Sequence, residues 1–283
     1  MGTHPQTSIL LIDCPDEKGL VHKISGVLFH HNYNMVGNRE FVDREAGHFF
    51  MRTEVVGEFI IEEIVQELKE QLPSTANIRV ASKEKKDIVI LATKEYHCIG
   101  DLLMRHQFGD LNANIKAVVS NHDSLKELTE KFNIPYHFIS HKDFEDRTAH
   151  EHAVLEAIKS YSPEYLVLAK YMRILTPNFV ANFGNQIVNI HHSFLPAFIG
   201  ANPYRQAYNR GVKIIGATAH FVSNDLDEGP IITQSTVEVD HSRSVKDMAR
   251  AGRDVEKFVL AQALKLVFED RVFVHGNKTI VFD

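Results

Sequence analysis

The sequence contains no tryptophan, only two cysteines and no long apolar run. Cys14 and Cys98 lie far apart in a chain of ordinary globular composition, which favours free thiols in a reducing cytoplasm over a disulfide. No stretch approaches the roughly 18 apolar residues that a membrane span needs, and residues 1–8 lack the basic and apolar regions of a secretory signal. The formal net charge of −6 offers no basic excess for binding nucleic acid.

Histidine is abundant, with 17 residues, but its arrangement does not predict a metal site. The chain has no H-E-x-x-H motif and no Cys/His cluster with the spacing of a zinc site. His150 and His152 lie in a polar stretch that begins a helix, which is typical of a solvated face. We therefore expect neither a metal nor another cofactor.

The length of 283 residues suits one large domain or two unequal ones. The charged stretch SKEKKD at 82–87 has the composition of a linker. We place the domain boundary there, with residues 1–84 in a first domain and residues 85–283 in a second.

Apolar periodicity in the first domain predicts the element order βαββαβ, which is a ferredoxin-like fold. The hairpin is indicated by two strand-like runs joined through a polar connection that ends in Gly47. The predicted strands are 7–13, 35–42, 47–56 and 78–81, and the predicted helices are 20–30 and 60–72.

The second domain alternates wholly apolar strands with helical patterns, which predicts a Rossmann-like α/β fold with a mostly parallel sheet covered on both faces. The predicted strands are 88–92, 113–120, 135–138, 165–169 and 186–190, followed by 214–222 and 231–239. The predicted helices are 99–106, 124–132, 150–160, 177–183 and 245–268.

Polar side chains gather where one of these buried strands ends. Asn189 and His191 are two residues apart, so an extended chain projects both from the same face. Ligands bind at the carboxyl ends of strands in open α/β sheets. The loop between the last two strands could bring Asp227 to the same place. An amide, an imidazole and a carboxylate together suit chemistry at a carbonyl carbon, where they stabilise an oxyanion and move a proton.

Three motifs in this domain resemble the formyltransferase family that uses 10-formyltetrahydrofolate: LAKYMRILTP at 168–177, NIH at 189–191, and the D-x-G-P loop in LDEGP. The resemblance implies catalytic roles for Asn189, His191 and Asp227. It also implies that the pterin lies against the loop formed by Met172, Arg173, Ile174 and Leu175, although Arg173 could instead be a surface salt-bridge partner. His192 could support the site or simply end the strand.

The first domain resembles an ACT domain in IDCPDEKGLVHKISGVL, in the dipeptide Asn34-Met35 and in GHFFMR at 47–52. ACT domains often bind amino acids and pair through their sheets. The resemblance implies a ligand pocket at Asp16, Gly19 and Asn34, and a homodimer or homotetramer. The alternative is a domain that only dimerises, with Gly19 as a turn residue and Asp16 near a helix N-terminus.

The ACT-like module, the sequence NIHHSF and the segment FIGANPYRQAYNRGVKIIGATAH resemble the hydrolytic members of the family. The resemblance implies hydrolysis of 10-formyltetrahydrofolate to formate and tetrahydrofolate, in one-carbon and purine metabolism. Because unregulated hydrolysis of a one-carbon donor would be wasteful, we expect the first domain to control the activity, with methionine or glycine as effector since both connect to one-carbon supply. The turn ATKEYHCIGD at 92–101 has one glycine, and Glu95 would oppose a phosphate, so water is the expected acceptor. The alternative is formyl transfer to a small amine.

Overall fold

The computed structural model describes residues 6–57, 61–197 and 202–282 and divides into two compact units. The first unit comprises Met1–Glu84, Glu269–Phe273 and Ile280–Asp283, and the second comprises Lys85–Phe268 and Val274–Thr279. The sequence predicted one domain for every residue after 84. The chain instead returns to the first unit, because Phe273 and Phe282 pack into an apolar cluster there.

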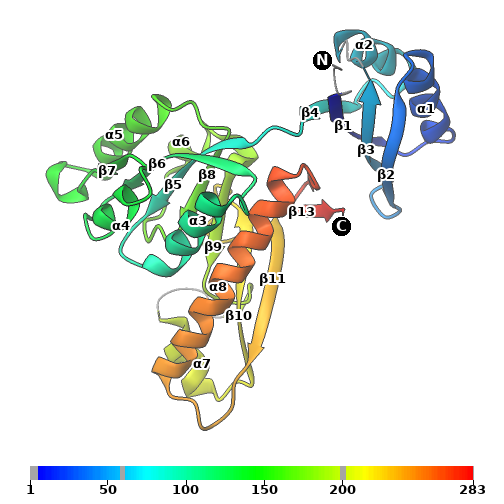
Figure 1. Ribbon diagram of the computed structural model, residues 1–283. Coiled ribbons are helices and arrows are strands. Elements are labelled where there is room, and N and C mark those ends of the chain that lie inside the picture. Colours follow the sequence, from blue (N-terminus) through cyan, green and yellow to red (C-terminus); the bar gives the residue numbers. More distant parts are fainter. Residues whose placement is uncertain (1–5, 58–60, 198–201, 283) are drawn as a thin grey trace. The chain divides into compact units, whose positions relative to one another are not determined.

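The first unit confirms the predicted βαββαβ order (Figure 1). Its four strands form an antiparallel sheet in the order β2-β3-β1-β4. Residue 60, where the second helix was predicted to begin, lies outside the described residues. The elements are β1 (Gln6–Pro15), α1 (Leu20–His30), β2 (Asn34–Asp43), β3 (His48–Gly57), α2 (Ile61–Gln71) and β4 (Asn77–Ser82).

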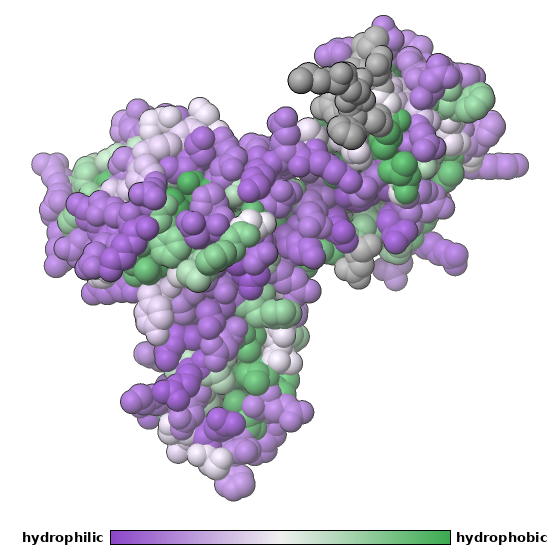
Figure 2. Space-filling model, in the orientation of Figure 1, coloured by the Kyte–Doolittle hydropathy of each residue, from purple (hydrophilic) through white to green (hydrophobic). Residues whose placement is uncertain are grey.

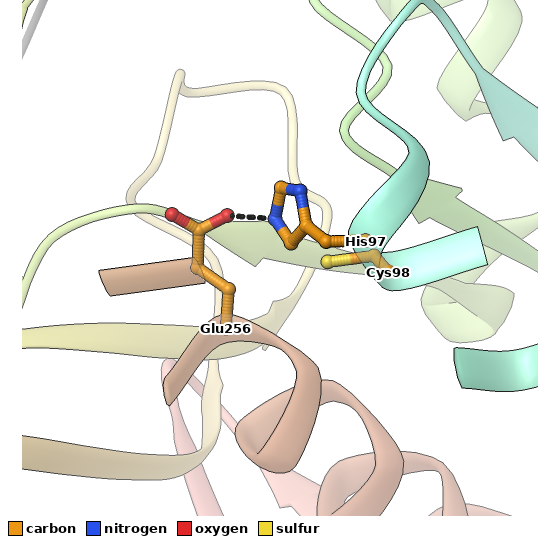
Figure 3. Close-up of side chains that lie close together, drawn as sticks. All are labelled: His97, Cys98 and Glu256. Atoms are coloured by element: carbon orange, nitrogen blue, oxygen red, sulfur yellow. Dashed lines mark hydrogen bonds and ion pairs between the residues drawn. The ribbon is translucent and has the colours of Figure 1, made fainter. Parts of the chain in front are cut away.

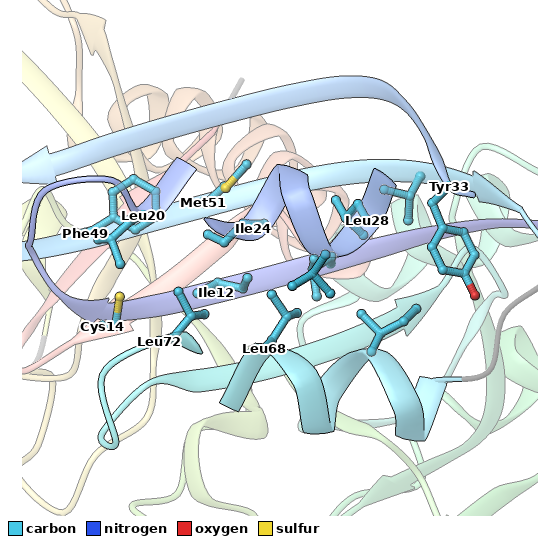
Figure 4. Close-up of a cluster of buried hydrophobic side chains, with 14 residues drawn as sticks. Ile12, Cys14, Leu20, Ile24, Leu28, Tyr33, Phe49, Met51, Leu68 and Leu72 are labelled. Carbon is cyan, nitrogen blue, oxygen red and sulfur yellow. The ribbon is translucent and has the colours of Figure 1, made fainter. Parts of the chain in front are cut away.

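Two apolar layers cover the two faces of this sheet. Helix α1 buries Leu20, Ile24, Val27 and Leu28, a helical spacing, against the side of β1 that carries Leu10, Ile12 and Cys14 (Figure 4). On the opposite side of β1, Ile9 and Leu11 join Phe50 and the two phenylalanines of the returning chain. The period of two along β1 therefore gives it two buried faces.

The second unit has a seven-stranded sheet in the order β11-β10-β9-β8-β5-β6-β7. The five strands from β9 to β7 in this order are parallel, and β10 and β11 run antiparallel at the edge, which confirms a mostly parallel sheet. The strands are β5 (Lys86–Ala92), β6 (Ala113–Ser120), β7 (Tyr136–Phe138), β8 (Tyr165–Ala169), β9 (Ile187–His191), β10 (Ile214–Phe221) and β11 (Ile231–Glu238).

Helices cover this sheet because its central strands are apolar on both faces. Ile88, Val89, Ile90 and Leu91 in β5 are completely buried. The helix α8 packs against β9, β10, β11 and α3 (Figure 1). The helices are α3 (Tyr96–Phe108), α4 (Lys126–Glu130), α5 (Arg147–Lys159), α6 (Pro177–Val180), α7 (Pro203–Arg210) and α8 (Val245–Phe268), and a short hairpin of β12 (Val272–His275) and β13 (Lys278–Val281) follows.

The side of the protein drawn in Figure 2 is mostly hydrophilic, with apolar residues in separate patches. In the described part of the chain, none of the helices has the length and apolar character to cross a membrane. Cys14 and Cys98 are both buried free thiols, as the sequence predicted.

Candidate active site

A cavity of about 480 Å³ opens beside the carboxyl ends of β8 and β9, and we call it the β8–β9 cavity. Asn189 and His191 both line it, as their spacing in β9 predicted. Asp227 reaches it from the loop between β10 and β11. The remaining lining residues include Lys170, Met172, Arg173, Ile174, Leu175, His192, Asn202, His220 and Leu226.

His191 and Asp227 form the first polar pair of the cavity. Nδ1 of His191 lies 3.2 Å from Oδ1 of Asp227. His191 is 6% exposed, and its Nε2 has no hydrogen-bond partner among the described residues. Burial opposes ionisation of Asp227, but the hydrogen bond and charge of His191 outweigh burial and hold the pKa of this carboxyl below its usual value. Asp227 is therefore a carboxylate that orients the His191 ring.

The Asp227 loop is fixed by close backbone packing. Asp227 has a positive φ of 58°, a conformation that costs energy for a residue with a side chain. A Cβ on Gly229 would overlap the carbonyl oxygen of Phe221, so the D-x-G-P pattern needs glycine at this position. The Phe221 N–H also donates to the carbonyl of Pro230 at 2.9 Å.

Asn189 is held by His220, a residue that the sequence analysis did not assign to the site. His220 Nδ1 lies 2.8 Å from the carbonyl of Phe221, which can only accept, so Nδ1 carries the proton. Burial lowers the pKa of His220, so the ring is neutral and its Nε2 is an acceptor. Asn189 Nδ2 lies 3.1 Å from this nitrogen and donates to it, which leaves one amide N–H for a ligand.

The antiparallel register explains how His220 was missed. His220 of β10 is the direct partner of Asn189 in β9. The sequence predicted both strands but not their pairing. The one available signal was a histidine at the end of a predicted strand, just ahead of the Asp227 loop.

His192 lines the same cavity and stacks on His191, with ring centroids 5.1 Å apart and 29° between the planes. Burial, reinforced by the positive charge of Lys170, lowers the pKa of His192 to about 4. The imidazole is therefore neutral near pH 7. This environment fits the predicted support role better than the alternative of a polar residue that simply ends the strand.

The loop predicted to hold the pterin lies along one wall of the cavity. Met172 and Ile174 are more than half exposed, so apolar surface is available to a ligand. The Met172 N–H donates to Thr93 Oγ1 at 3.0 Å, and the Ile174 carbonyl accepts from Arg147, which anchors the loop backbone. Arg173 forms no ion pair with any of the described residues. Its alternative role as a salt-bridge partner therefore has no support among them.

The three residues predicted to bind an effector lie in the first unit but not at one place. Asp16 and Gly19 are in the loop before α1, where Gly19 adopts a φ of 93°. Asn34 begins β2, after the other end of α1. At 1.5 Å per residue, a helix of 11 residues separates these ends by about 16 Å. One chain alone does not bring these residues into a single pocket.

A second group of polar residues is buried next to the β8–β9 cavity. His97, Lys170 and Tyr204 all contact the carboxylate of Glu256, and we call these four residues the Glu256 cluster. Oε2 of Glu256 lies 2.7 Å from His97 Nε2 and 3.2 Å from Lys170 Nζ, and Oε1 accepts from Tyr204 at 2.6 Å. Despite burial, these partners hold the pKa of Glu256 at about 2.

His97, Cys98 and Glu256 are also the one group of metal-ligand side chains found in the described residues, with ligand atoms within 4.8 Å (Figure 3). The neighbourhood does not suit a cation. Burial raises the pKa of the Cys98 thiol, and Lys170 already neutralises the carboxylate. His97 directs Nε2 at the same carboxylate, so its hydrogen bond competes with a metal.

Comparisons with known proteins cover both units. Residues 86–264 match the family described as formyl transferase, and residues 8–73 match the ACT domain. A formyltetrahydrofolate deformylase of Haemophilus influenzae is 55% identical over 98% of this chain and 99% of its own length. One from Bacillus subtilis is 46% identical over 97% and 93%, respectively.

Solved structures give the same result. The crystal structure of a formyltetrahydrofolate deformylase from Pseudomonas syringae superimposes with a TM-score of 0.94 and 41% identity, over 99% of this chain and 95% of that one. A glycinamide ribonucleotide transformylase from Symbiobacterium toebii covers 73% of this chain, with a TM-score of 0.68 and 29% identity. The chain belongs to the formyl transferase family and, within it, to the formyltetrahydrofolate deformylases.

Proposed function

We propose that this protein hydrolyses 10-formyltetrahydrofolate to formate and tetrahydrofolate at the β8–β9 cavity. The observation that carries the proposal is the joint placement of Asn189, His191 and Asp227 around one cavity, with the buried Nε2 of His191 free of any partner among the described residues. The full-length similarity to formyltetrahydrofolate deformylases supports the substrate.

Asn189 acts on the formyl oxygen. One of its amide hydrogens is committed to His220, so the other has a fixed direction and can donate to the oxyanion that forms when water attacks. Removing an oxyanion donor of this kind typically costs about 10²–10³ in rate.

His191 and Asp227 move the protons. Asp227 holds Nδ1 of His191, which leaves Nε2 to exchange a proton with the attacking water or the departing N10. General acid–base catalysis by such a group contributes about 10²–10⁴. These side chains supply the acid–base chemistry, and we propose that the reaction uses no cofactor.

The entrance to α3 supports water as the acceptor. Glu95 is the N-cap residue of α3, and its side chain makes no capping hydrogen bond. A carboxylate at this position repels a phosphorylated acceptor that would otherwise be attracted to the helix N-terminus. For the alternative activity, transfer to a small amine, the described residues offer no comparable supporting feature.

The folate lies between the loop at residues 172–175 and the Asp227 loop. Ile174, Leu175 and Leu226 supply apolar surface, and Arg173 supplies a positive charge for the acidic end of the substrate. His192 is the neutral neighbour that keeps the His191 ring in place.

The ACT domain gives the enzyme a means of regulation, with an amino acid as effector. Because Asp16 and Gly19 lie at the opposite end of α1 from Asn34, a site using all three needs two copies of the chain, in a homodimer or homotetramer. Methionine and glycine are the expected effectors, in one-carbon and purine metabolism, and a reducing cytoplasm is the expected location. If neither amino acid changes the activity at any concentration tested, this part of the proposal fails.

The test of the activity is formate release from 10-formyltetrahydrofolate with no other acceptor present, by the purified protein and by Asp227→Asn. We expect one formate per tetrahydrofolate from the wild type and a loss of at least about 10² in kcat for the variant. A folded wild type that releases formate only when an amine is added would instead be a transferase.

A further inference from the structure

Lys170 has an environment that the reaction steps above do not explain. It follows β8 directly and lines the β8–β9 cavity, but it is only 7% exposed. Lysine is rarely buried to this extent unless its charge is paired. Its φ of 61° places the backbone in the left-handed region, which is unfavourable for a residue with a Cβ. Such strain is often retained where a side chain has a function.

Glu256 fixes the position of the Lys170 ammonium group. The two groups lie 3.2 Å apart, and the carboxylate is itself held by His97 and Tyr204 from two other helices. His97 and Tyr204 already hydrogen-bond to the two oxygens of Glu256, and Lys170 adds the charge that neutralises it. The ammonium has three N–H bonds, and Glu256 is its one ion-pair partner among the described residues. The remaining N–H bonds are available to a ligand.

Hydrolysis differs from formyl transfer in the charge of its product. Water adds to the formyl carbon, the bond from this carbon to N10 breaks, and N10 takes one proton of the water. The formic acid then loses its single acidic proton, which is the second proton of the water, to solvent and becomes a formate anion. Transfer to an amine would give a neutral formamide, and a protonated amine would be repelled by a fixed cation.

We infer that Lys170 is the formate-binding residue of the β8–β9 cavity and that its charge selects water as the formyl acceptor. This inference rests on the proposed hydrolase function. The ammonium counteracts repulsion between the forming formate and the Asp227 carboxylate. His192 is neutral, and the charge of Lys170 contributes to its lowered pKa. The ring therefore adds a hydrogen-bonding group to the cavity but no second charge that would attract formate away from Lys170.

The test compares the full-length wild type with Lys170→Met. The readouts are the inhibition constant for sodium formate and the partition of formyl groups between water and added methylamine, which is mostly protonated at neutral pH, corrected for the reaction without enzyme. Loss of a charge-assisted hydrogen bond should weaken formate inhibition by about 10- to 100-fold. We expect N-methylformamide from the variant but none above the blank from the wild type. Lys116→Met, which removes an ion-paired lysine outside the cavity, should match the wild type.

A double variant separates formate binding from a purely structural role. Lys170→Met with Glu256→Gln removes both buried charges, so no uncompensated carboxylate remains. Weak formate inhibition should persist in the double variant. Recovery of wild-type inhibition and partition there would show that Lys170 only neutralises Glu256, and would overturn the inference. Binding of isotope-labelled formate, measured by NMR, needs no turnover and tests the role of Lys170 directly. Absence of formate release from the wild type would instead mean that the hydrolase proposal fails, so the two failures can be distinguished.

Discussion

Replacing His220 with phenylalanine tests whether this histidine aims Asn189 at the formyl oxygen. The substitution keeps a planar ring in a buried position but removes the nitrogen that accepts from Asn189 at 3.1 Å. A neutral hydrogen bond contributes about 1 kcal/mol, which corresponds to about a fivefold to tenfold loss of kcat. The upper bound is the loss of about 10²–10³ expected for Asn189→Ala itself. KM should change little, because the oxyanion exists only in the transition state.

The assay is a double-mutant cycle on steady-state formate release. If His220 acts through Asn189, then His220→Phe should have almost no effect in the Asn189→Ala background. Fully additive losses of kcat would refute the reasoning, because they would mean that the two side chains act independently. His137→Phe is the matched control, since it also removes a histidine hydrogen bond, to Tyr161, outside the cavity. Thermal unfolding of each variant checks that the fold is retained.

Two further predictions concern stability and the Asp227 loop. The pKa of Glu256 is depressed to about 2 from an ordinary value of 4.5, so its stabilising contribution is complete above about pH 4.5 and is lost as pH falls towards 2. This shift corresponds to about 3 kcal/mol of unfolding free energy. In denaturant unfolding over this pH range, Glu256→Gln should lose less stability than the wild type. Equal losses in the two proteins would contradict the assignment. Gly229→Ala should lower kcat by about 10² or more, because its Cβ overlaps the Phe221 carbonyl and must displace Asp227. Wild-type kinetics would show that the loop tolerates the shift.

The sequence predicted the parts of the structure that depend on local patterns. The apolar run in β1 and the helical spacing in α1 identified the first unit, and the apolar strands identified the parallel sheet. The β9 motif and the D-x-G-P loop placed Asn189, His191 and Asp227 at one site, and the structure brings them to one cavity. These signals are contained within short stretches of chain, so periodicity and motif matching can recover them.

The remaining features depend on pairings between distant segments. His220 belongs to the site because β10 lies antiparallel to β9 in one register, which neither strand specifies by itself. The Glu256 cluster joins residues from α3, α7, α8 and the end of β8, and its lysine occurs within a motif that the sequence analysis used only for the pterin. The predicted effector residues show the opposite case. They were grouped by their match to a family pattern, but they lie at opposite ends of α1 within one chain.

The return of Phe273 and Phe282 to the first unit means that the two units do not simply follow one another along the chain. In topological terms, most of the formyl transferase unit, Lys85–Phe268, is an insertion into the ACT-containing unit, because Glu269–Phe273 and Ile280–Asp283 return to that unit. A cut after residue 84 therefore severs the first unit from part of its own core, and it exposes two phenylalanines that now contact Ile9, Leu11 and Phe50. Transferring the ACT-containing unit intact to another protein therefore requires both pieces of the chain.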